Sequence, residues 1–500
     1  MDNNHVLSSN SPAEPGWKSL LILCSLIIGI RLIFTVIMGI MPQDAYYFFY
    51  ARHLDLSYYD HPPMIAYLLR FFTGIFGKHV WTIKLADTVT TALAMFAFYK
   101  LAKKFVSERK ALVATALFLS TLMVSILSLV STPDVPLILC WILSLNFLYE
   151  AIWFKKNVYW IWAGFMTGLS FDSKYTGIFI IIGIIGFLLI AKPCRKLLFS
   201  AWFFLYLLCF SITILPVVIW NMRNHFASFK FQSEGRVKEG IDFDISGFAG
   251  VVAHQSAILL PLLFVSLIYF IYRFCKKYGF RFARIRIDQL FLLCFFIPLF
   301  LGFFALSFFY WVKINWMMPA YITGIIWVCR YWNKNWLRYQ LIFSVVVHLA
   351  MSVEILFYVV PIRSDDTWFG WEEFSGKVES VRKEYPDAFI FSSDDYKTSA
   401  ILNFYLNEMV YSKNVVGEKA LQFDFVGTDL NLLNGKDAIF IDSNPRFSDL
   451  ENENKHIPPF YYFYFDRIIP LKPILIDKNG KAERKFSLFL CKNYHFKPRT

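Results

Sequence analysis

The sequence predicts an α-helical polytopic membrane protein, with about eleven transmembrane helices and a small C-terminal α/β domain. Three observations support this fold class. Of 500 residues, 57% are hydrophobic and 19% are aromatic, whereas only 17% are charged. Long apolar runs extend to about residue 360, and shorter runs of soluble proportions follow. Soluble domains average about 25% charged residues, so the composition disfavours a water-soluble enzyme and excludes disorder and collagen-like repeats.

Eleven apolar runs are candidate membrane spans, because a helix needs about 20 apolar residues to cross the hydrocarbon. They cover residues 18–41, 79–102, 111–130, 135–154, 158–171, 174–191, 197–220, 248–273, 289–311, 314–332 and 338–360. The fifth is short and ends near Ser170. We expect the first run to stay as an anchor, since it is too long for the apolar region of a signal peptide and no small-residue cleavage site follows it.

The placement of basic residues predicts the orientation. The net charge is +13, and Lys and Arg cluster in alternate loops, near 103–110, 155–156, 192–196, 273–286 and 330–338. Short loops rich in Lys and Arg stay cytoplasmic. We therefore expect a multi-pass inner-membrane protein with a cytoplasmic tail (1–17), a transmembrane module (18–360) with outer loops 42–78 and 221–247, and an extracytoplasmic domain (361–500). Charge placed in this way does not indicate nucleic acid as a partner.

The region after residue 361 has the pattern of a small α/β domain. A helix is predicted over 371–386, and strands are predicted over 388–393 and 437–442. A hairpin is predicted near 465–476 and 483–492, with its turn at Lys478-Asn479-Gly480-Lys481, because Asn-Gly favours the tight turns of hairpins.

Motifs of soluble nucleotide chemistry are missing from the sequence. No GxGxxG follows a predicted strand, and no P-loop is present, so direct use of ATP is unsupported. The eight cysteines form no CxxC pair and no Cys/His ligand spacing, which disfavours a disulfide framework or a zinc site. No cofactor is indicated with certainty; a divalent cation remains possible, with unknown ligands.

The first candidate site lies in outer loop 42–78. Asp44 precedes Tyr46 and Tyr47 in an aromatic stretch expected to form a helix along the membrane interface, and Asp60 and His61 precede Pro-Pro. This arrangement would place polar groups at the depth of lipid headgroups. An equally good interpretation is an aromatic belt with solvated loop charges.

Other outer boundaries carry further candidates. Asp134 lies in a loop of about four residues, and Lys174 and Tyr175 follow the fifth run. Lys174 either extends to the membrane surface along its apolar stem or contacts a phosphate. The segment with Asn221, Arg223, His225 and Gln232 mixes amides, bases and aromatics as sugar-binding sites do, although an ordinary interfacial helix fits equally. Lys313 and Asn315 follow the ninth run; an ionisable group at membrane depth costs about 2.5–3.5 kcal/mol, which suggests a functional partner.

Five motifs taken together resemble those of a known family. They are Asp44-Ala-Tyr-Tyr, Tyr59-Asp60-His61-Pro-Pro, Thr132-Pro133-Asp134, Gly168-Leu169 with Ser173-Lys174-Tyr175, and Trp220-Asn221 through Phe231-Gln232. In this order the series resembles bacterial GT-C glycosyltransferases, polyprenyl-phosphate-sugar-dependent enzymes similar to protein mannosyltransferases and the lipid A aminoarabinose transferase. The resemblance covers about 40–320, and the stretch 396–406 is similar to the family's extracytoplasmic domain.

The resemblance implies roles for these residues. Asp44 would act as catalytic base or orient the acceptor hydroxyl, with Asp60 and Asp134 as further catalytic acidic positions and Lys174 near the lipid phosphate. Many relatives have Asp-Glu before Ala-Tyr-Tyr, whereas this chain has Gln43-Asp44 and lacks one acid. The substrate-binding candidates are Tyr46, Tyr47, His61, Lys174, Tyr175, Asn221, Arg223, His225, Gln232, Lys313 and Asn315.

The implied function is transfer of a sugar from a polyprenyl-phosphate donor to an envelope glycolipid, polysaccharide or protein, at the extracytoplasmic face and in contact with membrane lipids. A transporter or flippase of lipid-linked sugars is the main alternative, and a non-catalytic scaffold for envelope assembly is another. Transporters usually carry ionisable groups near the bilayer midplane and paired repeats. Here the acidic residues lie at outer boundaries and no repeat is visible, which favours the enzyme.

Overall fold

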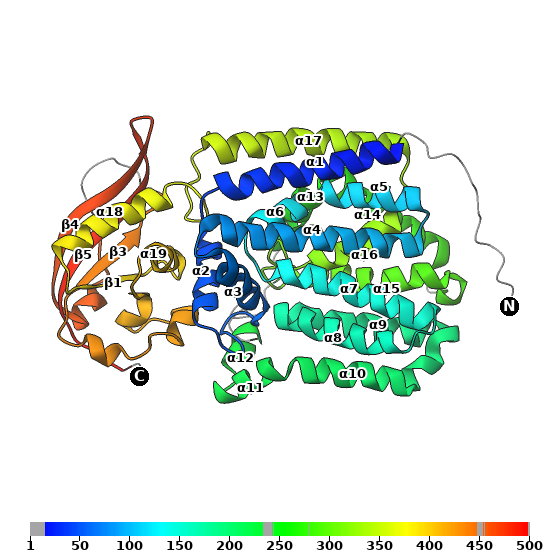
Figure 1. Ribbon diagram of the computed structural model, residues 1–500, viewed down its shortest axis with the longest axis horizontal. Helices are drawn as coiled ribbons and strands as arrows, with labels where there is room; N and C mark the ends of the chain where they lie inside the picture. The colour runs from blue at the N-terminus through cyan, green and yellow to red at the C-terminus, as the bar shows by residue number, and fades with distance from the viewer. Residues whose placement is uncertain are drawn as a thin grey trace.

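The computed structural model describes residues 16–233, 243, 245–279, 281–447, 454 and 456–498. A bundle of helices forms one part, and a β-sheet domain lies at one end of it (Figure 1). Residues 1–15 of the predicted cytoplasmic tail lie outside the described residues. Most of the second half of outer loop 221–247 also lies outside them.

The helices of the bundle follow the predicted apolar runs, with additional helices in the loops. They are α1 (Gly16–Ile37), α2 (Pro42–Arg52), α3 (Met64–Phe76), α4 (Val80–Phe105), α5 (Glu108–Leu119), α6 (Leu122–Leu129), α7 (Asp134–Trp153), α8 (Val158–Ser173), α9 (Phe179–Ile190), α10 (Ala201–Thr213), α11 (Leu215–Arg223), α12 (Ala227–Ser233), α13 (Ile245–Leu259), α14 (Pro261–Tyr278), α15 (Ile287–Leu306), α16 (Met318–Val328) and α17 (Lys334–Phe357). A short 3₁₀ helix, η1 (Tyr175–Ile178), precedes α9.

The predicted number of membrane spans can be compared with the described helices by their length and composition. Among the described residues three helices, α7, α15 and α17, are long and apolar enough to cross a membrane, and the number rises to seven if each of four bent pairs is one span. The prediction of about eleven transmembrane helices is therefore not confirmed. Two predicted straight spans are broken: α5 and α6 meet at 65°, and α13 and α14 meet at 114°. At the second break, Pro261 begins the new helix, and proline cannot continue the preceding one.

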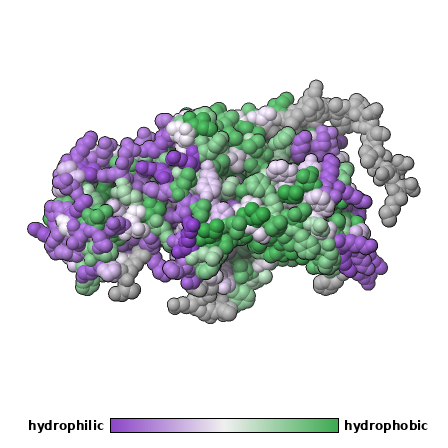
Figure 2. Space-filling view, turned by 60° about the horizontal axis from the view of Figure 1, so that its bottom comes forward, coloured by the Kyte–Doolittle hydropathy of each residue, from purple (hydrophilic) through white to green (hydrophobic). Residues whose placement is uncertain are grey.

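Hydropathy divides the surface into a belt and two polar ends. Figure 2 shows hydrophobic residues around the middle of the molecule, with hydrophilic residues over the sheet domain on the left and at the opposite end. Helix α17 contributes strongly to the belt, because Ile342, Val346, Leu349 and Val353 are exposed along it. A continuous apolar surface of this kind suits contact with lipid rather than water.

Several of the basic loops meet at the end of the bundle away from the sheet. Lys104 pairs with Glu150, Lys110 Nζ donates to the carbonyl oxygens of Cys329 and Trp332 at 3.0 and 2.8 Å, and Arg330 binds Asp288 at 2.7 Å. These contacts join the last turns of α4 and α7, the first turns of α5 and α15, and the segment that follows α16. The alternation of basic and acidic loops in the sequence thus corresponds to two different ends of the molecule.

The C-terminal domain is a five-stranded sheet with the order β2-β1-β3-β5-β4. Its elements are α18 (Trp371–Glu384), β1 (Phe389–Ser392), α19 (Lys397–Tyr405), β2 (Val410–Tyr411), β3 (Ala438–Ser443), β4 (Phe465–Lys478) and β5 (Lys481–Tyr494). β1 is parallel to β2 and β3, whereas β5 is antiparallel to β3 and β4. The predicted helix, strands and hairpin are present, and Asn479 and Gly480 both have positive φ in the turn, as a type I′ turn requires.

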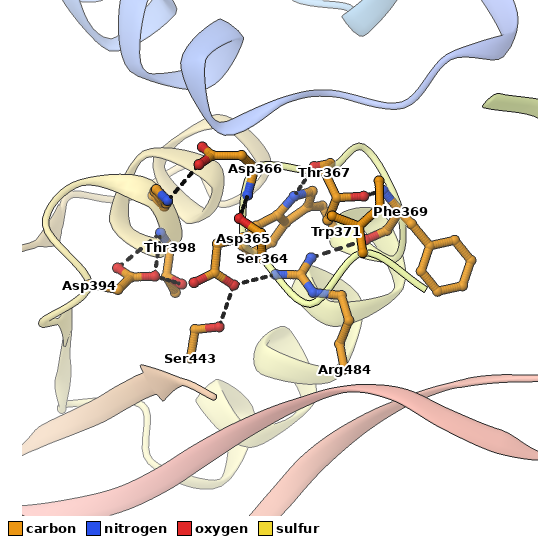
Figure 3. Close-up of polar contacts among 12 residues, drawn as sticks. Ser364, Asp365, Asp366, Thr367, Phe369, Trp371, Asp394, Thr398, Ser443 and Arg484 are labelled. Carbon is orange, nitrogen blue, oxygen red and sulfur yellow. Dashed lines mark hydrogen bonds and ion pairs between the residues drawn. The ribbon is translucent and has the colours of Figure 1, made fainter. Parts of the chain in front are cut away.

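A buried ion pair fixes this domain to the segment that connects it with α17 (Figure 3). Arg484 on β5 donates to Asp365 at 2.9 Å and to the carbonyl oxygen of Phe369 at 3.0 Å. Its guanidinium carbon lies 3.7 Å from the ring centroid of Trp371. Ser443, at the end of β3, donates to the same Asp365 oxygen at 2.5 Å. These contacts fix the connecting segment to strands β3 and β5 of the sheet.

Candidate active site

Helix α2 lies between the bundle and the C-terminal domain. The ring of Phe49 stacks on Phe423 with centroids 4.5 Å apart, and the ring of Tyr46 lies 4.3 Å from that of Tyr396. Gln43 Nε2 donates to Asp366 Oδ1 at 2.8 Å. The predicted helix is present, but Tyr46 is buried with Tyr47. An aromatic belt facing lipid is therefore the wrong interpretation of these tyrosines: the C-terminal domain covers them.

Asp44 is fully buried and has several hydrogen-bond donors. It is the third residue of α2, and its carboxylate accepts hydrogen bonds from the backbone N–H of Met41 at 2.8 Å and of Ser131 at 2.8 Å. Lys84, on α4, forms an ion pair with it, and both side chains have 0% exposure. Asp44 thus joins the start of α2 to α4 and to the end of α6, and it does not face an open space.

Lys84 and Asp87 belong to this buried layer and were missed by the sequence analysis. Lys84 Nζ also donates to the carbonyl oxygen of Leu129 at 2.5 Å, and Asp87 accepts from the Ser131 hydroxyl at 2.6 Å. The broken end of α6 leaves carbonyl groups without helical partners, and α4 supplies the donors. Two charges three residues apart in an apolar run were the signal that could have identified them.

Asp60 lies between α2 and the segment after α11. Its carboxylate accepts from the Tyr46 hydroxyl at 3.1 Å and from the Tyr50 hydroxyl. Gln232 Nε2, on α12, donates to the backbone carbonyl of Asp60 at 2.6 Å. The Tyr46 hydroxyl also accepts from the backbone N–H of Gln422 at 3.2 Å, so the C-terminal domain takes part in holding this carboxylate.

Burial raises the pKa of Asp60 above its ordinary value. The hydrogen bonds from Tyr50 and Tyr46 and the positive charge of Lys313 oppose this increase. A carboxylate with a raised pKa binds a proton more readily, which suits a general base. The predicted candidate Lys313 is thus close enough to Asp60 to act on it electrostatically.

A second carboxylate, Asp134, begins α7 and holds Lys174. Lys174 Nζ contacts both oxygens of Asp134 at 2.9 and 3.0 Å, and Asn315 Nδ2 donates to Asp134 at 2.6 Å. Lys174 is buried, so the interpretation as a lysine that extends to the membrane surface is wrong. Three predicted candidates from distant parts of the chain therefore form one cluster.

A cavity of about 230 Å³ lies beside Lys174. Its lining residues are His61, Lys174, Tyr175, Thr176, Phe179, Gln232, Phe303 and Trp316. Two bases and an amide share this space with an aromatic wall, and sites for small amphipathic ligands have this composition. Asp60 adjoins the cavity through its neighbour His61 and its partner Gln232.

The remaining predicted residues have other environments. Asn221 is fully buried and binds the carbonyl of Val217 and the N–H of Phe229 at 3.0 and 3.2 Å, so it connects α11 with α12 instead of meeting a ligand. Arg223 and His225 are exposed and do not belong to the cavity lining. These three residues do not line the cavity beside Lys174, and substrate binding by them stays a prediction.

The arrangement has the elements of a transfer reaction at a phosphate-bearing leaving group. Lys174 and His61 can meet an anion, and Asp60 can accept a proton, while Phe179, Phe303 and Trp316 offer apolar contacts. Within the described residues no three His, Cys, Asp or Glu side chains gather as metal ligands. The side chains that line the cavity offer electrostatic and acid–base chemistry.

Comparisons with known proteins agree with this geometry. A family model described as dolichyl-phosphate-mannose-protein mannosyltransferase matches residues 60–220, which include Asp60, Asp134 and Lys174. The crystal structure of ArnT from Cupriavidus metallidurans in the apo state matches with a TM-score of 0.59 at 13% identity, covering 95% of this chain and 98% of that one. The chain has the GT-C glycosyltransferase fold.

One further solved structure and two curated proteins are also similar to this chain. ArnT bound to undecaprenyl phosphate matches with a TM-score of 0.57 at 14% identity, over 95% of this chain and 98% of that chain. The lipid A galacturonosyltransferase RgtD of Rhizobium johnstonii is 23% identical over 237 residues, 47% of this chain and 49% of the relative. The putative mannosyltransferase YycA of Bacillus subtilis is 25% identical over 144 residues, 28% of this chain and 21% of the relative. The matched segments thus span half or less of these two curated relatives, although the GT-C fold itself extends over nearly the whole chain.

Proposed function

We propose that this GT-C protein is a membrane glycosyltransferase that transfers a sugar from a polyprenyl-phosphate donor to an envelope acceptor. The observation that carries the proposal is the cavity where Lys174 and His61 meet an aromatic wall next to Asp60. The wall suits a prenyl chain and the two bases suit its phosphate. The names of the relatives support the same class: one is a lipid A galacturonosyltransferase and one is an ArnT with undecaprenyl phosphate bound.

In the proposed reaction, an acceptor hydroxyl attacks the anomeric carbon of the donor sugar. A new C–O bond forms, the bond from the sugar to the phosphate oxygen breaks, and the phosphate leaves with the electron pair. Lys174 and His61 stabilise the charge that develops on this phosphate. The hydroxyl proton passes to a carboxylate. Because the leaving group is already anionic, little acid assistance is needed.

Asp60 is the carboxylate that we assign as base. Asp44 has 0% exposure and binds Lys84 and two backbone N–H groups, which leaves it engaged on every side. Asp60 retains 7% exposure, adjoins the cavity and has a raised pKa. Asp44 then acts as a positioning residue that fixes the helix carrying Tyr46 and Tyr50. Asp134 has a similar role, since it holds Lys174 in the cavity wall.

The acceptor and the orientation complete the proposal. The cavity lies near the C-terminal domain, because Tyr59, two residues before the lining residue His61, donates its backbone N–H to Gln422 of that domain. The basic loops lie at the opposite end. By the positive-inside rule the domain then faces the extracytoplasmic side of an inner membrane. An acceptor in the envelope, a glycolipid, a polysaccharide or a protein, would meet the donor there.

The test is a transfer assay with the purified full-length chain in lipid nanodiscs. Radiolabelled polyprenyl-phosphate sugars are offered together with envelope glycolipids, polysaccharides or proteins. We expect label to appear covalently on one acceptor class, which would also identify it. Movement of the labelled lipid between leaflets without a new glycosidic bond would instead favour a flippase. Absence of both would contradict the proposal.

The charge of Lys313 gives a prediction for the pH dependence. As a base, Asp60 must be ionised, so kcat/KM should rise with pH through its raised pKa. Lys313 lowers that pKa; removal of its charge in Lys313→Gln is therefore expected to move the acidic limb of the profile to higher pH. Lys472→Gln, at an exposed position of β4, serves as control and should leave the limb in place. A shift of the Lys313→Gln profile to lower pH would refute the assignment.

A further inference from the structure

The C-terminal domain contains a second cavity, of about 160 Å³, far along the chain from the first set of site residues. Its lining residues are Ser393, Glu418, Phe440, Asp442, His456, Ile457, Pro458, Phe460, Tyr461 and Phe489. Four of these are Phe or Tyr, and two are carboxylates. The volume is below the about 300–1,000 Å³ of clefts that hold drug-sized ligands, so the cavity suits a single small ring.

The position of this cavity in the sheet is a favourable one for a ligand. From β1 the chain passes through α19 to β2 on one side, and β3 then pairs with β1 on the other side, with all three strands parallel. The order of strands therefore reverses between β1 and β3. In open α/β sheets, ligands bind outside the carboxyl ends of strands at such a switch point. Ser393 directly follows β1, and Asp442 lies at the end of β3.

The polar groups at this point are held in place. The Ser393 hydroxyl donates to Asp442 Oδ1 at 3.3 Å. Burial is the main cause that raises the pKa of Tyr461; the hydrogen bond with Ser393 lowers it, and the charges of Glu418 and Asp442, which line the same cavity, raise it further. The Tyr461 ring packs on Phe440 and Phe460 with centroids 5.1 and 4.8 Å apart. Carboxylates accept hydrogen bonds and do not donate them when ionised.

We infer that this cavity binds one sugar ring carrying a free amine. The aromatic side chains cover the C–H face of the ring, and the carboxylates accept hydrogen bonds from the amine and the hydroxyls. Two carboxylates and one imidazole, that of His456, give the lining an acidic balance, which disfavours a phosphate or a uronic acid at the same place. The binding of an amino sugar does not depend on the proposed function. A role of this site in holding the glycan of the acceptor does rest on that function.

The experiment measures binding to the full-length chain in nanodiscs by saturation-transfer NMR and calorimetry. The probes are methyl β-glucosaminide, methyl β-glucoside, methyl β-glucuronide and ethanolamine. We expect affinity to fall in the order glucosaminide, glucoside, glucuronide, with no competition by ethanolamine because it lacks a ring. Equal binding of glucuronide and glucosaminide, or no binding of glucosaminide, would overturn the inference.

Substitutions in the lining test whether the sugar binds in this cavity. Asp442→Asn should weaken glucosaminide binding about tenfold or more, since a charge-assisted hydrogen bond is lost, and Phe460→Ala should weaken glucoside and glucosaminide alike. Asp477→Asn, an equal change of charge at an exposed position of the hairpin, is the control. If Asp442→Asn unfolds the domain, Glu418→Gln at an exposed position tests the same point. One of these two carboxylate variants is measured in its folded state. If glucosaminide binding is unchanged in that variant, the binding site lies elsewhere.

The two proposals fail separately. Loss of sugar binding in a chain that still transfers label from the lipid donor would remove this site and leave the proposed function. Sugar binding in a chain that transfers no label would leave the site and remove the function.

Discussion

Asp60→Asn is expected to lower kcat/KM for sugar transfer by about 10²–10⁴-fold, the typical contribution of a positioned general base. The amide oxygen of asparagine still accepts the hydrogen bonds that Tyr46 and Tyr50 donate to Asp60, so α2 and the C-terminal domain should stay in place. What is lost is the negative charge and the ability to take the proton. The measurement is initial-rate transfer from a polyprenyl-phosphate sugar, with thermal unfolding of the same preparation.

Glu379→Gln is the control for this change. Glu379 lies on α18 with its side chain 60% exposed, and neutralising it should leave transfer unchanged. Asp44→Asn is the informative comparison, because we assign Asp44 a positioning role. If Asp44→Asn abolishes transfer in a stable protein while Asp60→Asn keeps near wild-type turnover, Asp44 is the base and our assignment is reversed.

Lys84→Met is expected to destabilise the protein by about 3–5 kcal/mol, the typical effect of removing one partner from a buried ion pair. The large effect arises because Asp44 would remain charged without its partner at 0% exposure. The end of α6 would also lose the donor to Leu129. The free energy of unfolding, obtained by denaturant titration in detergent micelles, measures the effect.

Two further variants separate charge from packing. Lys103→Met removes a lysine from the same helix, but its ion pair with Glu108 is exposed, so the cost should be about 0–1 kcal/mol. The double variant Lys84→Met, Asp44→Asn no longer leaves the Asp44 charge without its partner and should recover much of the stability lost in Lys84→Met. If the double variant is less stable than Lys84→Met alone, the loss comes from something other than the ion pair. Partial recovery of transfer in the double variant would support the positioning role of Asp44.

The motifs located much of the site before its geometry was known. Asp134, Lys174 and Asn315 were separate candidates at three outer boundaries, and they form one cluster. This success has a simple reason: a charged side chain is costly near hydrocarbon, so its presence at the end of an apolar run marks a place where a partner exists. The α/β elements of the C-terminal domain were predictable because their alternation and the Asn-Gly turn are local signals.

Other features depended on contacts between distant segments. Lys84 lies inside an apolar run, and only the break between α5 and α6 places its partners beside it. The same holds for Tyr46, which has the composition of an interfacial aromatic but is covered by Gln422 and Tyr396 from the C-terminal domain. The span count is not confirmed, because hydropathy records where residues are apolar and not where a helix bends, as at the breaks between α5 and α6 and between α13 and α14.

By itself the sequence determined that this is a largely helical, lipid-compatible chain with a small α/β domain, and which boundary carries each charged side chain. Those properties follow from local composition, which each segment carries with it. The tertiary structure decided which charges neutralise one another and which remain beside a cavity. Asp44 and Asp60 are alike as sequence, yet one is enclosed by Lys84 and backbone N–H groups, and the other lies next to His61 and binds Gln232, both of which line a cavity. Burial and pairing are properties of the packed assembly, and they set the charge and reactivity of a carboxylate.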